Sequence, residues 1–154
     1  MHRMIAIAAP LLLLSILPAA AVDTRAKLEK FEFFGQWAPH CGRAASPENP
    51  RRDAYFNPKG HAVFTENFGE GHQPNVYVVR EARHEGPQRL LLRIELNGDA
   101  VQDLTMIRRG GLIRTMTNRR VADESVLVRA GIVASNGAPT PWLRRCGEAV
   151  KTVR

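Results

Sequence analysis

From residue 54 onward, the sequence consists of short segments rich in strand-forming residues, separated by Gly, Pro, Asn and Asp at intervals of about ten positions. This spacing is typical of an antiparallel β-meander. No long amphipathic helical pattern stands between the segments. The apolar faces of the strands therefore have to pack against one another, either by closure of the sheet or by folding into a sandwich.

Recognisable turns separate these segments. Asn57-Pro58-Lys59-Gly60 suits a type I turn, and Asn97-Gly98 favours a tight hairpin. Before the second turn, alternate residues from Leu90 to Leu96 are apolar, which predicts one buried strand face. We expect roughly seven or eight strands, at residues 34–41, 54–56, 61–66, 75–84, 88–96, 100–108, 112–118 and 126–133, and a loop over residues 42–53.

The predicted fold is all-β, an antiparallel meander closed into a small barrel or half-barrel, with a β-sandwich as the alternative. Closure removes the unpaired strand edges that promote aggregation. Short helical turns are expected at both ends. Near the C-terminus, Thr140, Pro141 and Gly147 match an N-cap, a first-turn proline and a C-terminal glycine. We expect an arm or short helix at residues 22–33, one barrel domain at residues 34–147 and a tail at residues 148–154.

Residues 1–21 match a cleaved export signal. A short basic start is followed by a mostly apolar run over residues 4–17 and by Ala19-Ala20-Ala21, which fits the small-residue cleavage rule. The apolar run is shorter than the roughly 20 residues that cross a bilayer, which disfavours the alternative of an uncleaved membrane anchor. We expect cleavage after Ala21 and a periplasmic or secreted product without a transmembrane anchor.

The chain has two cysteines, Cys41 and Cys146. An oxidising compartment favours a disulfide between them. Closing a loop of about 100 residues stabilises a fold by roughly 4–5 kcal/mol in the chain-entropy model. The alternatives are two free thiols or a redox-active pair, although the sequence has no Cys-x-x-Cys motif.

A tryptophan precedes each cysteine by four positions, Trp37 before Cys41 and Trp142 before Cys146. The disulfide is therefore expected to bring the two tryptophans together. We predict that they close one end of the barrel, and an aromatic ligand platform is the alternative.

Gly35-Gln36-Trp37 resembles the opening signature of lipocalin-like barrels, in which a late arginine packs over the tryptophan. Arg144 and Arg145 are the candidates for that arginine. The order of signal peptide, Gly-x-Trp-x-x-x-Cys, Asn-Pro loop, meander and Thr-Pro-Trp-Leu-x-x-Cys also resembles a set of short exported proteobacterial proteins. This resemblance implies export and a barrel-like fold, and it implies no activity, ligand or catalytic residue.

A weaker likeness is to small periplasmic inhibitors of secreted metalloproteases, which are also exported lipocalin-like barrels with one disulfide and an early tryptophan. In that family the cysteines lie close together, whereas here they lie near opposite ends. The family's N-terminal arm enters the protease cleft, and the resemblance would give this role to residues 22–30.

Catalysis has no motif to support it, because the sequence lacks a Walker loop, a zinc-protease helix, a Rossmann glycine motif and a nucleophile elbow. His61 and His72 would form a metal site with Glu66 or Glu70 only if they converged at a loop mouth. Solvent-facing loop histidines are the favoured interpretation. We expect no enzyme activity, no metal and no cofactor.

The formal net charge is +7, and arginine pairs hold much of the positive charge. If the turns gather at the barrel ends, some of these pairs form a basic rim able to bind phosphate or carboxylate groups. A solvated surface is the alternative. Export disfavours nucleic acid and favours an envelope protein or an anionic envelope component as partner. The candidate anion-binding residues are Arg51, Arg52, Arg108, Arg109, Arg119 and Arg120.

The sequence thus leaves several hypotheses. The first is a non-enzymatic exported barrel that binds a partner or a small ligand, and the others are a protease inhibitor, a binder of anionic envelope components, and an enzyme that uses His61 and His72. An open apolar cavity favours a small ligand, whereas a filled interior favours a protein partner.

Overall fold

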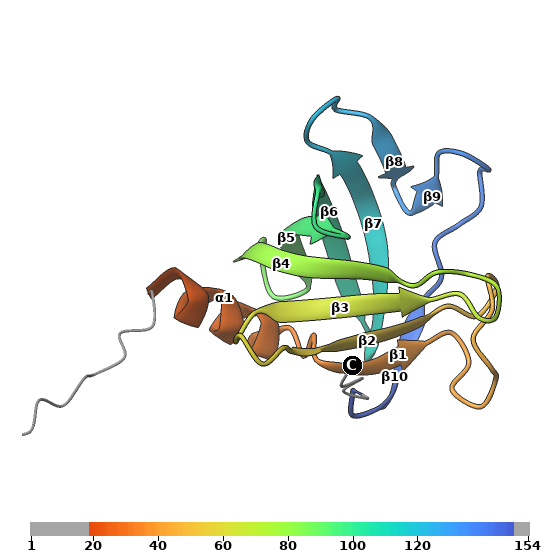
Figure 1. Ribbon diagram of the computed structural model, residues 1–154, viewed down its shortest axis with the longest axis horizontal. Coiled ribbons are helices and arrows are strands. Elements are labelled where there is room, and N and C mark those ends of the chain that lie inside the picture. The colour runs from red at the N-terminus through yellow and green to blue at the C-terminus, as the bar shows by residue number, and fades with distance from the viewer. Residues whose placement is uncertain (1–18, 150–154) are drawn as a thin grey trace, which may run out of the picture.

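The computed structural model describes residues 19–149. Most of the predicted leader and tail, at residues 1–18 and 150–154, lies outside the described residues. The described part contains one helix and ten strands (Figure 1). The elements are α1 (Ala19–Lys30), β1 (Gly35–Ala38), β2 (Arg51–Phe56), β3 (Ala62–Asn67), β4 (Asn75–His84), β5 (Arg89–Leu96), β6 (Ala100–Arg109), β7 (Leu112–Arg120), β8 (Val126–Arg129), β9 (Ile132–Val133) and β10 (Leu143–Gly147).

The strands form a closed antiparallel barrel. Each strand from β1 to β7 pairs with its neighbour in sequence, β10 pairs with β1, and a second pairing between β10 and β7 closes the ring of eight strands. The short strands β8 and β9 continue the sheet beyond β7. The predicted barrel is confirmed, and the β-sandwich alternative is wrong.

Most strand positions follow the predicted pattern. The strand at residues 75–84 is confirmed without change, and Leu90, Leu92 and Ile94 are buried on one face of β5. Both residues of the Asn97-Gly98 turn have positive φ values of 51° and 91°, as a tight type I′ hairpin requires.

The predicted loop over residues 42–53 ends earlier than expected, because β2 begins at Arg51. The register of the β2–β3 hairpin explains the difference. Pairing that starts at the predicted Ala54 continues outward through Asp53 and Arg52 to Arg51, opposite Asn67. The arginines that suggested a loop are held in the sheet by this pairing.

The predicted C-terminal helical turn is wrong, because β10 occupies these residues. Leu143 and Arg144 pair with β7, while Arg144, Arg145 and Gly147 pair with β1. Both neighbours offer ladder hydrogen bonds and Leu143 gains a buried site, so tertiary pairing overrides the local capping pattern.

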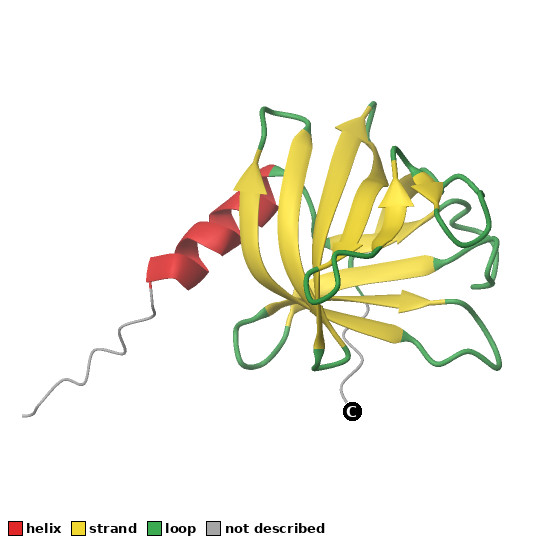
Figure 2. Cartoon of the chain, turned by 90° about the horizontal axis from the view of Figure 1, so that it is seen from above, coloured by secondary structure: helices red, strands yellow, loops and turns green. Residues whose placement is uncertain are grey.

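The helix α1 seals one end of the barrel (Figures 1 and 2). Leu28 is fully buried and Phe31, just after the helix, is 1% exposed. His84 Nε2, at the end of β4, donates to the carbonyl of Lys27 at 2.9 Å, and Arg108 Nη1 donates to the carbonyl of Phe31 at 3.1 Å. The helix end is therefore part of the barrel core. No helix within residues 19–149 has the length and apolarity needed to cross a bilayer.

The predicted closure residues divide between the core and the outer wall. Trp37 is buried and donates from Nε1 to the carbonyl of Phe33 at 3.0 Å. The half-buried ring of Trp142 instead lies 5.6 Å from the guanidinium of Arg114. Because the neighbouring Leu143 faces the core, alternation places Trp142 outside. The tryptophans are not brought together as predicted.

Gly35 lies at a close approach of β1 and β10. Its φ is 128°, and a Cβ atom there would lie 2.7 Å from Nε of Arg145 and 2.9 Å from the carbonyl oxygen of Gly147. Only glycine fits this crossing of β1 and β10 without a shift. Arg145 therefore lies against β1 at this crossing, and both Arg144 and Arg145 are exposed. The assignment of either residue as the late arginine of a lipocalin-like barrel stays a prediction. The predicted disulfide between Cys41 and Cys146 is present near this crossing, with 5.3 Å between the Cα atoms.

Candidate functional site

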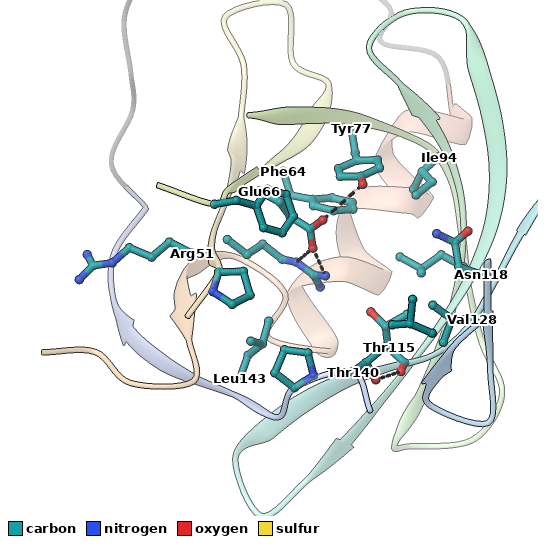
Figure 3. A pocket seen from close by; sticks show the side chains of 16 residues that line it. Arg51, Phe64, Glu66, Tyr77, Ile94, Thr115, Asn118, Val128, Thr140 and Leu143 are labelled. Atoms are coloured by element: carbon teal, nitrogen blue, oxygen red, sulfur yellow. Dashed lines mark hydrogen bonds and ion pairs between the residues drawn. The ribbon is translucent and has the colours of Figure 1, made fainter. Parts of the chain in front are cut away.

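The barrel interior contains a cavity of about 210 Å³ at the end opposite α1 (Figure 3). Strands β2 to β7 supply most of its wall because inward residues alternate along each strand. Segments near Pro50, Phe68 and Pro141 lie at its edge. An eight-stranded barrel has an interior that side chains fill or that holds one small ligand. The remaining lining residues are Arg51, Arg52, Phe64, Glu66, Tyr77, Ile94, Leu104, Thr115, Asn118, Val128, Val133, Thr140 and Leu143.

An ion pair lies in the wall of this cavity. Arg52 on β2 is 5% exposed, and its Nη2 and Nε atoms donate to Glu66 Oε1 on β3 at 2.6 and 3.2 Å. The register places Arg52 directly opposite Glu66. The guanidinium also lies 4.9 Å from the centre of the Phe64 ring, within cation–π range. The interior thus holds one positive and one negative side chain, which compensate each other.

Tyr77 on β4 is hydrogen-bonded to the same ion pair. Its hydroxyl donates to Glu66 Oε2 at 3.3 Å and accepts a hydrogen bond from Asn75 Nδ2 at 3.2 Å. Its ring stacks on Phe64, with centroids 4.5 Å apart. Burial, aided by the negative charge of Glu66, raises the pKa of Tyr77 well above its ordinary value of 10.0. The hydroxyl is therefore a neutral hydrogen-bonding group at neutral pH.

The raised pKa of Tyr77 predicts a steep loss of stability in alkali. Above pH 10 the unfolded chain releases the tyrosine proton while the folded barrel keeps it, so the free energy of unfolding falls by about 1.4 kcal/mol per pH unit from this group. Tyr77→Phe removes the contribution, and its stability curve should be flatter between pH 10 and 11.5. Urea unfolding at several pH values measures both slopes. Equal slopes would show that Tyr77 ionises freely in the folded protein.

The opposite wall carries an amide pair. Asn118 on β7 donates from Nδ2 to Gln102 Oε1 on β6 at 2.8 Å. Gln102 is 2% exposed. In this orientation Asn118 Oδ1 is buried without a hydrogen-bond partner among the described residues. Val128 faces Asn118 across the β7–β8 register, so this wall combines an amide with apolar surface.

The predicted arginine rim is not continuous. Arg52 lies inside the barrel beside Glu66, and this placement corrects the prediction that it belongs to an exposed rim. Arg51 extends away from the cavity (Figure 3). Its Nη2 donates to the carbonyls of Cys41 and Arg43 at 3.0 and 2.6 Å.

The other candidate arginines are spread over both barrel ends, and most of them have acidic neighbours. Arg109 and Arg144 are exposed. Binding of an anionic envelope component through such arginines stays a prediction. The ion pairs are Arg108 with Glu32, Arg119 with Asp103 and Glu124, Arg120 with Asp123, and Arg145 with Glu148.

The histidines considered for a metal site do not converge. His61 precedes β3 and His72 follows it, so they lie at opposite ends of a six-residue strand, which is about 20 Å long. Glu66, one of the two proposed acidic ligands, faces the interior and pairs with Arg52. Within residues 19–149 no cluster of His, Cys, Asp and Glu has the geometry to hold a metal ion.

Residues 22–30, compared above with an inhibitory arm, belong to α1. Leu28 is fully buried in the barrel core. Deleting this segment would therefore remove core packing together with any inhibitory contact. The hypothesis of protease inhibition stays a prediction, and that deletion would not test it.

A larger groove, of about 760 Å³, follows β4 to β8 and includes the middle of α1. Its charged side chains largely compensate one another. Arg80 pairs with Glu95, and Arg93 pairs with Asp103 at 2.9 Å. The Arg93 hydrogen bond holds the pKa of Asp103 below its ordinary value. This exposed, paired surface defines a ligand less sharply than the smaller cavity inside the barrel does.

The grouping of Arg52, Glu66, Tyr77 and Asn118 was not predicted from the sequence. The available signal was alternation, since Arg52 shares a strand face with the buried Ala54, and Glu66 shares one with Phe64. Assigning residues 42–53 to a loop hid that signal. The contact between the two strand faces depends on barrel closure.

Comparison with protein-family models, with curated proteins and with solved structures finds no match to this chain. The candidate site is therefore defined by the geometry of the cavity and the chemistry of its walls.

Proposed function

We propose that this protein is an exported, non-enzymatic barrel that binds one small, neutral and mostly apolar molecule in its interior. The cavity of about 210 Å³ is the observation that carries this proposal. A dry apolar cavity of about 150 Å³ is large enough for benzene. The cavity here is therefore suited to a single ring with one or two substituents.

The electrostatics of the interior support a neutral ligand. Arg52 and Glu66 compensate each other within the wall, and Arg51 extends away from the cavity. A charged ligand would bring an uncompensated charge into a space of low dielectric, which is unfavourable. The surrounding side chains, among them Ile94 and Leu104, supply apolar contacts to a ring.

Export is part of the same proposal. The leader-like composition of residues 1–21 supports it. The disulfide between Cys41 and Cys146 fits an oxidising compartment.

Ligand binding can be tested by NMR titration of the folded protein with p-cresol. We expect saturable shifts at the backbone amides of Ile94, Leu104 and Thr115, which line the cavity. Val128→Phe places a larger ring into the same space and should abolish the shifts. Val128 lines the cavity but lies outside the main core cluster, so the fold should tolerate this change.

Val76→Phe is the matched control, because Val76 is 38% exposed and does not line the cavity. It should leave binding unchanged. Absence of saturable shifts in the native protein, or equal binding by Val128→Phe, would refute the proposed cavity site.

A further inference from the structure

Glu66 is the more accessible member of the ion pair in the cavity wall. Its side chain keeps 20% of its surface exposed, whereas the side chain of its partner Arg52 keeps 6%. A molecule entering the cavity therefore meets the carboxylate more readily than the guanidinium. A carboxylate accepts hydrogen bonds and donates none. A ligand that binds the Glu66 carboxylate directly therefore needs a hydrogen-bond donor.

The two oxygens of Glu66 are unequally satisfied. Oε1 accepts both hydrogen bonds from Arg52, at 2.6 and 3.2 Å. Oε2 accepts from the hydroxyl of Tyr77 at 3.3 Å, which is longer than the roughly 2.5–2.7 Å of a strong O–H···O⁻ bond. A carboxylate offers about four lone-pair positions. Oε2 can therefore accept a second and shorter hydrogen bond.

We infer that Glu66 Oε2 accepts a hydrogen bond from a hydroxyl or N–H group of a neutral single-ring ligand, whose ring lies against the apolar walls of the cavity. This inference rests on the proposed function and adds the chemical class of the ligand. A cationic donor is disfavoured, because it would share one carboxylate with Arg52 and leave a net positive charge in the interior. Phenols and related ring N–H compounds fit this description.

Three ring compounds of similar size test the inference. p-Cresol carries a hydroxyl donor, 4-methylanisole carries the same oxygen without its hydrogen, and toluene lacks the oxygen. A hydrogen bond to a charged acceptor favours the first compound, and we expect NMR titrations to give p-cresol at least about tenfold higher affinity than either of the others. Equal affinities for the three compounds would overturn the donor requirement and leave the cavity site intact.

The double variant Arg52→Met/Glu66→Leu identifies the acceptor. It replaces both charged partners together, so no unpaired charge is left in the interior. We expect it to bind toluene at least as well as p-cresol, which is a loss of the preference by about tenfold. A persistent preference for p-cresol would show that another group accepts the hydrogen bond and would overturn the role of Glu66. Failure of the native protein to bind any of the three compounds would overturn this inference together with the proposed function.

Discussion

Replacing both cysteines with alanine is expected to lower the free energy of unfolding by about 4–5 kcal/mol. The disulfide between Cys41 and Cys146 spans 105 positions, so its loss frees most of the unfolded chain. Domains of this size are commonly stable by only about 5–15 kcal/mol. The double variant Cys41→Ala/Cys146→Ala should therefore unfold at much lower urea concentration, and urea titration followed by circular dichroism measures the change.

The position of the disulfide adds a structural reason for a large effect. It fixes β10 beside β1, and the β10–β7 pairing that closes the ring has only two register positions, Leu143 with Ile113 and Arg144 with Leu112. Reduction of the native protein should reproduce the variant's stability, and reductant should leave the variant unchanged. A loss below about 1 kcal/mol would show that these strand pairings hold the ring without the covalent bond.

Glu66→Leu alone is expected to destabilise the barrel by about 3–4 kcal/mol, because it leaves the guanidinium of Arg52 buried without an anionic partner. The coupled variant Arg52→Met/Glu66→Leu should return to within about 1 kcal/mol of the native protein, since a compact apolar pair replaces the buried charges. Urea unfolding of the native protein, both single variants and the double variant gives the coupling energy.

The cation–π contact between Arg52 and Phe64 limits how far the double variant recovers, because methionine supplies packing but no charge above the ring. The outcome that contradicts this account is a single Glu66→Leu variant that loses less than about 1 kcal/mol. In that case water would solvate the Arg52 guanidinium inside the cavity.

The strands and their turns were predictable because they follow local rules. Asn97-Gly98 can adopt the two positive φ values of a tight hairpin, and the apolar alternation from Leu90 to Ile94 marks a buried face. Cys41 and Cys146 were predictable as a pair because they are the only cysteines in the chain. Each of these signals can be identified from neighbouring residues or from the composition.

At the C-terminal segment, local sequence rules predict the wrong secondary structure. Thr140, Pro141 and Gly147 carry the signals of a helical turn, yet Leu143–Gly147 is the strand β10. Pairing with both β1 and β7 supplies hydrogen-bond partners for the backbone of β10 and buries Leu143. That pairing exists only after distant strands have been brought together, so no local pattern encodes it.

The sequence by itself determined the meander, its hairpins and the identity of the disulfide partners, because turn chemistry and strand alternation act over a few residues. The tertiary structure alone decided that Arg52, Glu66 and Tyr77 meet inside the barrel and that a cavity remains beside them. Register across separate strands sets those contacts, and the fit of many side chains at once sets the unfilled volume.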